Sequence, residues 1–204
     1  MVLPTSEARE HVVKKFGAIE GGKQTLTRLD SFLAQKYSPT KPFVISRTLN
    51  APRELVWKVF TDPEHMSQWW GPKGFTVIAS KMDLRTGGMY HYGLRASDGS
   101  EMWGRCMYRK IDAPKKLVFI NSFSDEKGGL TRHPGHQAWP LEMLTIYTFE
   151  EKDGKTVFTI EWMPINASAS EVETFDKGRA SMTQGWSGTI SQLEEYLKAQ
   201  QVKK

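Results

Sequence analysis

The sequence predicts an α+β domain in which a curved antiparallel sheet of seven strands wraps around a long C-terminal helix. Seven stretches between residues 43 and 163 read as strands, and most are separated by short turn-forming sequences. Two short helical stretches follow the first strand, and residues 171–198 carry an apolar stripe at helical spacing. A sheet curved in this way does not close tightly on one helix, so we expect a pocket between them.

The predicted C-terminal helix needs a partner surface for its apolar stripe. The stripe consists of Val172, Phe175, Met182, Trp186, Ile190, Leu193 and Leu197. Docking it can outweigh the cost of about 1 kcal/mol for each interior glycine. We expect the part from Ile190 onward to anchor the helix on the sheet. We expect Phe175, Met182 and Trp186 to form one wall of the pocket.

The seven strands are placed by period-two alternation and by turn residues. They are expected at residues 43–49, 75–84, 89–95, 102–111, 116–123, 141–149 and 156–163. Turn sequences such as Asp98-Gly99 and Asp153-Gly154 are short, so consecutive strands should pair antiparallel. The connection at residues 124–140 is long and polar, and connections of this length often act as functional lids.

Two short helices are expected between the first and second strands. Asn50 is placed as the cap of the first, with Pro52 in its first turn. Asp62 followed by Pro63 begins the second, and Gly71-Pro72 ends it.

Residues 1–40 are expected to form an extra N-terminal helix, an appendage to a main domain at residues 41–204. Its apolar residues have helical spacing, with an interruption at Gly21-Gly22. That stripe would be exposed unless it docks on a second protomer or on the outer surface of its own domain. A homodimer is therefore one expected partner arrangement, and both alternatives stay open.

Composition excludes several partner classes. The net charge is +5, but 28 basic residues are diluted among 23 acidic ones without a basic run, so nucleic-acid binding is not expected. Cys106 is the single cysteine, which leaves no intramolecular disulfide or cysteine metal site and suits a reducing compartment. There is no signal-like segment and no apolar run long enough for a membrane span. We therefore expect a cytoplasmic protein without membrane partners.

Several ordered motifs resemble one superfamily. They are VWKVFTDPEHMSQWWGPKGF (56–75), DLRTGGMYHY (83–92), IDAPKKLVF (111–119), TIYTFEEKDGKTVFTIEW (145–162) and GWSGTISQLEEYL (185–197). In these stretches the chain resembles the START-like, or SRPBCC, helix-grip superfamily, which includes polyketide-cyclase-like proteins. It resembles most closely the branch of the activator of the heat-shock protein 90 ATPase. The resemblance covers residues 43–198.

The resemblance implies a hydrophobic cavity between the sheet and the C-terminal helix. Members of the superfamily include small-molecule binders, cyclases, drug-sequestering proteins and a co-chaperone domain. The preferred interpretation is a protein that binds a small hydrophobic molecule, with no cofactor. Two alternatives stay open: a cyclase- or hydrolase-like enzyme that uses the same cavity, and a co-chaperone-like interaction module.

The candidate ligand-binding residues are aromatic residues and methionines. They are Trp69, Trp70, Met89, Trp103, Met107, Phe119, Met143, Trp162, Phe175, Met182 and Trp186. Large polarisable side chains of this kind form surfaces that adapt to varied apolar ligands. The same residues could equally fill an ordinary core. Trp69 and Trp70 are adjacent after a short helix, so we expect one to point inward and the other to face the cavity mouth or a neighbouring subunit.

Four strand residues are candidate polar groups of the cavity: His91, Arg105, Asn121 and Glu142. In the enzyme alternative, Glu142, His91 or Arg105 would act as acid, base or electrostatic stabiliser. Alternation alone does not tell which face each one occupies, and solvent-facing positions are the competing interpretation. No catalytic residue is assigned. His133 and His136 have no third ligand nearby, so no metal site is expected.

Overall fold

The computed structural model describes residues 40–202, together with residues 13, 23 and 24. The chain divides into a first unit, residues 1–39, and a second unit, residues 40–204. The predicted N-terminal appendage and its stripe therefore lie outside the described residues, except at those three positions, which are helical. The fold described below is that of the second unit.

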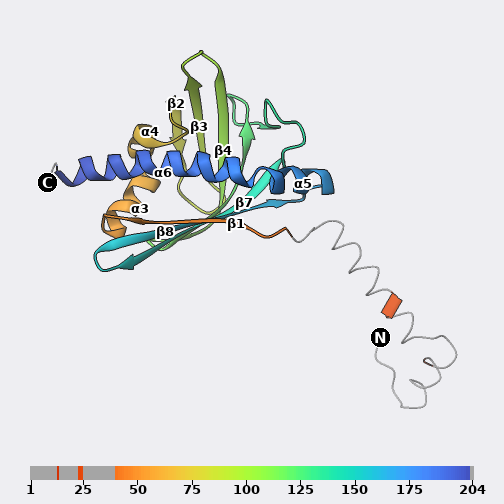
Figure 1. The fold of residues 1–204 in the computed structure, drawn as a ribbon, viewed down its shortest axis with the longest axis horizontal. Helices are drawn as coiled ribbons and strands as arrows, with labels where there is room; N and C mark the ends of the chain where they lie inside the picture. The colour runs from red at the N-terminus through yellow and green to blue at the C-terminus, as the bar shows by residue number, and fades with distance from the viewer. Residues whose placement is uncertain (1–12, 14–22, 25–39, 203–204) are drawn as a thin grey trace. The chain divides into compact units, whose positions relative to one another are not determined.

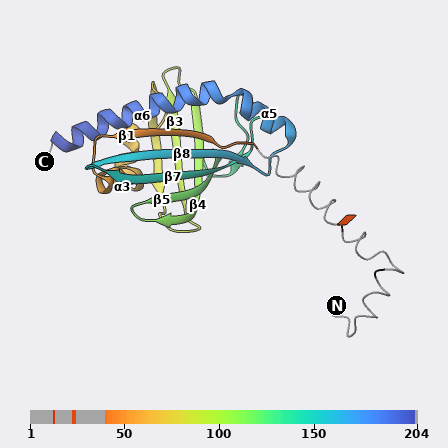
Figure 2. The ribbon, with the colours of Figure 1, turned by 60° about the horizontal axis from the view of Figure 1, so that its bottom comes forward.

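The second unit confirms the predicted helix-grip architecture (Figure 1). Its elements are β1 (Phe43–Leu49), α3 (Arg53–Thr61), α4 (Pro63–Trp69), β2 (Phe75–Met82), β3 (Met89–Ala96), β4 (Glu101–Asp112), β5 (Lys116–Ser124), β6 (Leu130–Thr131), β7 (Glu142–Lys152), β8 (Lys155–Ile165), α5 (Ala169–Lys177) and α6 (Arg179–Val202). Seven of the eight strands of one antiparallel sheet follow the order β1-β8-β7-β5-β4-β3-β2, and the eighth, β6, pairs with β5 off this path. The long helix α6 crosses β3 and β4 (Figure 1) and runs in nearly the same direction as β1 and β8 (Figure 2).

The strand predictions are confirmed within a few residues at each end. The predicted first strand at residues 43–49 is β1, and Asp153-Gly154 forms the tight turn between β7 and β8. Both turn residues have positive φ, 53° and 72°, which is the conformation that a two-residue hairpin turn with right-handed twist requires. The sequence missed β6, a two-residue strand that pairs with β5 inside the long connection.

Two helix predictions need correction. Asn50 does not cap α3: Pro52 occupies the cap position, and the Asn50 carbonyl instead accepts a hydrogen bond from Gln201 of α6. The predicted single helix at residues 171–198 is two helices, because α5 ends at Lys177, Gly178 is its C-cap, and α6 begins at Arg179. Asp62, by contrast, caps α4 as predicted, since its carboxylate accepts from the backbone N–H of Glu64.

The core lies on the face of the sheet that α3, α4 and α6 cover, which we call the inner face. Ile190, Leu193 and Leu197 of α6 are buried there, which confirms their anchoring role. The opposite side of the sheet is called the outer face. No helix among the described residues is long and apolar enough to cross a membrane.

Candidate functional site

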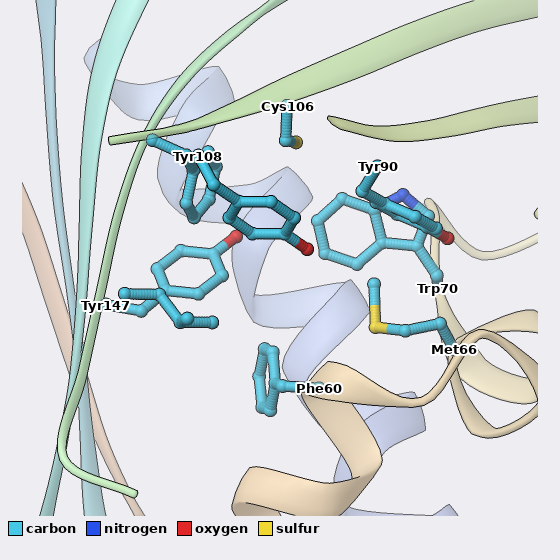
Figure 3. Close-up of a pocket in the computed structure, with 9 residues that line it drawn as sticks. Phe60, Met66, Trp70, Tyr90, Cys106, Tyr108 and Tyr147 are labelled. Carbon is cyan, nitrogen blue, oxygen red and sulfur yellow. The ribbon is translucent and has the colours of Figure 1, made fainter. Parts of the chain in front are cut away.

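A small cavity lies between the inner face and the helices α3 and α4 (Figure 3). Its nine lining residues come from four strands, two helices and the loop after α4: Phe60, Met66, Trp70, Tyr90, Cys106, Tyr108, Leu117, Phe119 and Tyr147. The cavity measures about 20 Å³. That is room for about one water molecule, whereas pockets for drug-sized ligands measure roughly 300–1,000 Å³. In this conformation the interior is therefore nearly closed.

Interlocking aromatic rings form the walls of the cavity. Phe60 contacts Trp69, Tyr147 and Phe158 with ring centroids 4.8, 5.5 and 4.8 Å apart. Phe119 meets Tyr147 edge-on at 4.9 Å. Edge-to-face pairs at these distances stabilise beyond their buried area, so the walls are held in one arrangement.

Three tyrosine side chains provide the polar surface of the cavity. The Tyr108 hydroxyl points toward Trp70, and the Tyr147 hydroxyl points toward Tyr108 (Figure 3). The hydroxyls of Tyr90 and Ser80 lie 3.4 Å apart, and Ser80 also donates to the carbonyl of Pro63. Burial raises the pKa of Tyr90, Tyr108 and Tyr147, so all three phenols are protonated at neutral pH.

The remaining polar atoms of the cavity are also uncharged. Burial raises the pKa of the Cys106 thiol, so the sulfur is a poor nucleophile. The Trp70 indole N–H is buried and has no well-formed hydrogen bond to any described residue. The Trp70 ring packs edge-on against the Tyr92 ring, and the Tyr92 hydroxyl interacts with the Trp70 side chain. The nine lining side chains thus include neutral donors and no carboxylate, ammonium or imidazole.

A second group of apolar side chains fills the interior beside α5 and the start of α6. It consists of Phe43, Met143, Phe175 and Met182, with Ile45, Trp139, Trp162 and Trp186 packed against it. Asn121 faces this region, and its carbonyl oxygen accepts hydrogen bonds from Thr145 (2.6 Å) and from the indole of Trp162 (2.7 Å). We call this group the second cluster.

Five of the seven tryptophans form a continuous row between the cavity and the long connection. Successive ring centroids lie 5.5 Å apart for Trp69 and Trp70, 6.0 Å for Trp70 and Trp186, 6.2 Å for Trp186 and Trp162, and 5.9 Å for Trp162 and Trp139. This tryptophan row joins the cavity to the second cluster.

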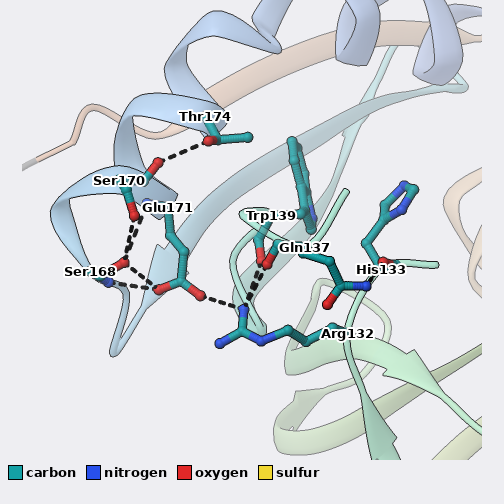
Figure 4. Close-up of polar contacts among 8 residues, drawn as sticks. All are labelled: Arg132, His133, Gln137, Trp139, Ser168, Ser170, Glu171 and Thr174. Atoms are coloured by element: carbon teal, nitrogen blue, oxygen red, sulfur yellow. Dashed lines mark hydrogen bonds and ion pairs between the residues drawn. The ribbon is translucent and has the colours of Figure 1, made fainter. Parts of the chain in front are cut away.

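The connection at residues 124–140 closes the second cluster at the end near α5 (Figure 4). Arg132 donates to the Glu171 carboxylate at 2.7 Å and to the carbonyls of Gln137 and Trp139. Glu171 also accepts from the Ser168 backbone and hydroxyl at the start of α5. Burial alone would raise the pKa of Glu171, but the hydrogen bonds from Arg132 and Ser168 outweigh it, and the pKa is lowered.

Trp139 is the apolar part of this closure. Its ring lies 5.9 Å from those of Phe175 and Trp162, and an added Cβ at Gly178 would lie 3.2 Å from it. The break between α5 and α6 therefore falls where the indole needs room.

The comparison with known families covers most of the second unit. The family model described as "Activator of Hsp90 ATPase homolog 1-like protein" matches residues 50–198, which is most of the chain. The chain belongs to this family. The matched range begins after β1 and ends within α6, so it contains every residue that lines the cavity. No curated protein matches the chain.

Solved structures similar to this AHSA1-like chain have the same fold. Protein Ms6760 from Mycobacterium smegmatis is 27% identical with a TM-score of 0.60, over 74% of this chain and 87% of that one. Protein NE0264 from Nitrosomonas europaea is 22% identical with a TM-score of 0.63, over 79% and 97%. An AHSA1-like protein from Aeromonas hydrophila is 20% identical with a TM-score of 0.55, over 76% and 92%.

The predicted ligand-binding residues of this AHSA1-like chain lie in three places. Trp70 and Phe119 line the cavity, and Trp69 lies directly behind it against Phe60. The second cluster and the side chains packed on it contain Met143, Trp162, Phe175, Met182 and Trp186. Met89, Trp103 and Met107 alternate with the buried residues of β3 and β4 and lie on the outer face.

The predicted polar groups lie on both faces of the sheet. Asn121 faces the interior, whereas His91, Arg105 and Glu142 lie on the outer face. The Nε2–H of His91 donates to the Asp125 carbonyl oxygen at 3.1 Å, and the imidazole ring stacks on Trp103. Arg105 donates to the Ser122 hydroxyl and the Gly128 carbonyl. Both residues therefore hold the start of the long connection against the sheet.

Sequence reasoning missed seven lining residues: Phe60, Met66, Tyr90, Cys106, Tyr108, Leu117 and Tyr147. One signal was available, because Tyr90, Tyr108 and Tyr147 lie within predicted strands and all three face the cavity, each opposite another lining residue: Cys106, Phe119 and Leu117 respectively. Choosing the tyrosines of each strand over its methionines would have identified the inner face.

Proposed function

We propose that this AHSA1-like protein binds a small, largely apolar molecule in its aromatic interior, between the sheet and the helices. The observation that carries the proposal is a cavity walled by aromatic rings whose polar groups are all neutral. Such a lining suits a flat apolar molecule with one or two hydrogen-bonding atoms, because a charged ligand would meet no opposite charge there. The helix-grip resemblance implies the same class of ligand.

Binding requires the cavity to enlarge beyond the volume of one water. Trp70 is the lining residue best placed to move, because it is partly exposed and its indole N–H forms no well-aligned hydrogen bond. Its neighbour Trp186 is also partly exposed, and the two rings lie 6.0 Å apart. Separation of these two indoles would open the interior without unpacking the ring contacts of Phe60.

The enzyme alternative has less support from the geometry. Its acid, base and stabilising groups were Glu142, His91 and Arg105, and all three lie on the outer face. None of them faces the cavity, so no observation favours a reaction there over simple binding.

Two measurements test the binding proposal. Native mass spectrometry of freshly purified protein should show a retained small molecule, or the protein should bind the neutral apolar probe N-phenyl-1-naphthylamine saturably with quenching of tryptophan fluorescence. Cys106→Leu fills the cavity and should weaken probe binding at least about tenfold, at a cost of roughly 1–3 kcal/mol of stability. Met107→Leu, at the adjacent outer-face position, is the matched control and should bind as wild type does.

The contradicting outcome is specific. If Cys106→Leu remains folded by thermal melting and binds the probe with wild-type affinity, the interior is not the binding site.

A further inference from the structure

An apolar ladder crosses five neighbouring strands on the outer face of the sheet. The register places its members directly opposite one another, in the order Met89, Met107, Ile120, Leu144 and Met163. Residues directly opposite in an antiparallel pair share one face of the sheet. All five are partly exposed. At about 4.8 Å between strands, the ladder is roughly 19 Å long.

This composition is unusual for a sheet that helices cover on one side only, as they do within residues 40–202. When helices cover one face of an antiparallel sheet, the other face usually carries polar residues. Here α3, α4 and α6 lie on the inner face, and the outer face nevertheless carries aliphatic residues and methionines along one continuous line. A continuous apolar surface rich in methionine is typical of a protein-binding site.

In the next row of the outer face, a basic residue on β4 and an acidic residue on β8 flank two apolar residues, and a valine on the edge strand β1 ends the row. Its order across the sheet is Lys110, Val118, Ile146, Glu161 and Val44. Lys110 on β4 is exposed, Glu161 on β8 is partly exposed, and Val44 on the edge strand is 55% exposed. The row is therefore positive on the β4 side and negative on the β8 side.

The row on the other side of the ladder is partly covered by the chain itself. Its residues His91 and Arg105 hold the start of the long connection, and a Cβ at Gly128 would lie 3.3 Å from Met89. The open part of the outer face therefore runs from Met107 to Met163 and includes the charged row.

We propose that this outer face binds a second copy of the chain around a two-fold axis parallel to β5 and β7. Such an axis reverses the order of the strands, so β4 of one copy faces β8 of the other. Met107 then faces the partner's Met163, and Ile120 faces the partner's Leu144. Lys110 faces the partner's Glu161, and every contact occurs twice.

Self-complementarity of this kind is what an isologous dimer requires. In this dimer the apolar ladder of one copy lies against the apolar ladder of the other. Lys110 of each copy lies against Glu161 of its partner. Any other orientation about the centre of the face, such as an axis across the strands, would not bring Lys110 to Glu161. Charge complementarity thus selects both the second copy and its orientation.

Sedimentation velocity and light scattering of the full chain, from micromolar to near-millimolar concentration, test the proposal. The wild type should form a concentration-dependent dimer. Ile120→Lys and Leu144→Lys place a charge at the centre of the apolar contact and should raise the dimer dissociation constant at least about 100-fold.

A charge swap at exposed positions provides the test that does not depend on core packing. Lys110→Glu and Glu161→Lys should each weaken the dimer about tenfold, because each creates two like-charge contacts. The double variant K110E/E161K should return to within about threefold of wild type. Lys73→Glu, an equal charge change outside this face, is the matched control and should leave the dimer unchanged.

Three outcomes overturn the proposal. They are a wild type that stays monomeric throughout the concentration range, a dimer that Ile120→Lys and Leu144→Lys leave intact, and a double swap that is no tighter than the single variants. Thermal melting of each variant separates loss of the dimer from loss of the fold.

Discussion

On the inner face, β4 presents Cys106 and Tyr108 to a cavity walled by aromatic rings, whereas on the outer face it presents Met107 between Met89 and Ile120. The Tyr108 ring is fixed by an edge-to-face contact with Phe119, which in turn meets Tyr147 edge-on. The outer side chains are flexible or aliphatic and lie partly exposed. Both faces are apolar, so hydrophobicity alone does not distinguish them; rigidity, hydroxyl content and cover by helices do.

The reactivity of neighbouring thiols should show the largest difference between the faces. Cys106 is buried and the pKa of its thiol is raised, so it reacts only when the fold opens. A cysteine introduced by Met107→Cys should react with a thiol reagent about 100-fold faster or more, at low protein concentration. Stopped-flow labelling of that variant should therefore show one fast and one slow thiol. A single slow phase in wild type is the control, and two equally fast thiols would contradict the assignment of the faces.

Truncation of matched leucines should show the next largest difference. Leu117→Ala removes a fully buried side chain of the inner face and should cost about 3 kcal/mol of unfolding free energy. Leu144→Ala, in the outer ladder, should cost about 1 kcal/mol because the site is already partly solvated. Urea denaturation of both variants measures the two values. Equal costs would mean that the ladder is as tightly packed in the monomer as the core.

A pair of tryptophans provides a smaller contrast. The Trp162 indole donates to Asn121 at 2.7 Å inside the fold, whereas the Trp103 indole donates to the exposed Glu101 at 3.3 Å. Trp162→Phe should cost about 1–2 kcal/mol, because it removes a partly buried hydrogen bond and some packing. Trp103→Phe should cost below about 0.5 kcal/mol. Thermal unfolding compares them, and a larger loss for Trp103→Phe would reverse the contrast.

The long connection runs from the outer face to the second cluster, and its ion pair with α5 should contribute a modest, pH-dependent effect. Glu171→Gln weakens the contact with Arg132 and should cost about 1 kcal/mol at pH 7, since Arg132 is 43% exposed. The folded-state pKa of Glu171 lies below its ordinary value of 4.5, so the carboxylate stabilises fully above about that pH. The stability gap between wild type and variant should therefore close as the pH falls below 4.5.

Glu173→Gln is the control for that pH dependence. Its carboxylate pairs with Lys177 on the exposed side of α5, so its effect should be small throughout. A gap for Glu171→Gln that widens in acid would contradict the proposed role of the carboxylate.

The fold was predictable because turns and periodicity are local signals. β1 matches its predicted range, and Asp62 caps α4 as its sequence indicates. The break at Gly178 was not predictable from spacing, because the apolar stripe continues through it. It depends on the contact with Trp139, a residue about forty positions earlier in the chain.

The site was less predictable because both faces of several strands are apolar. In β4, Met107 and Tyr108 are equally plausible interior residues when only alternation is known. In the outer ladder, apolar residues occupy the strand positions where polar residues would normally identify the solvent-facing side. Only the position of the helices, which depends on contacts distant in sequence, decides which residues line the cavity.

The tryptophan row has an optical consequence. The ring centroids of Trp70, Trp186, Trp162 and Trp139 lie 6.0, 6.2 and 5.9 Å apart along the row, so excitation absorbed by one indole should pass to its neighbours before emission. A molecule that quenches Trp70 in the cavity would then also reduce the fluorescence that is excited at Trp139, next to the long connection. A displacement of Trp139 would in turn shift the emission maximum of the tryptophan fluorescence. Tryptophan fluorescence of the unmodified protein should therefore respond both to binding in the cavity and to movement of the long connection.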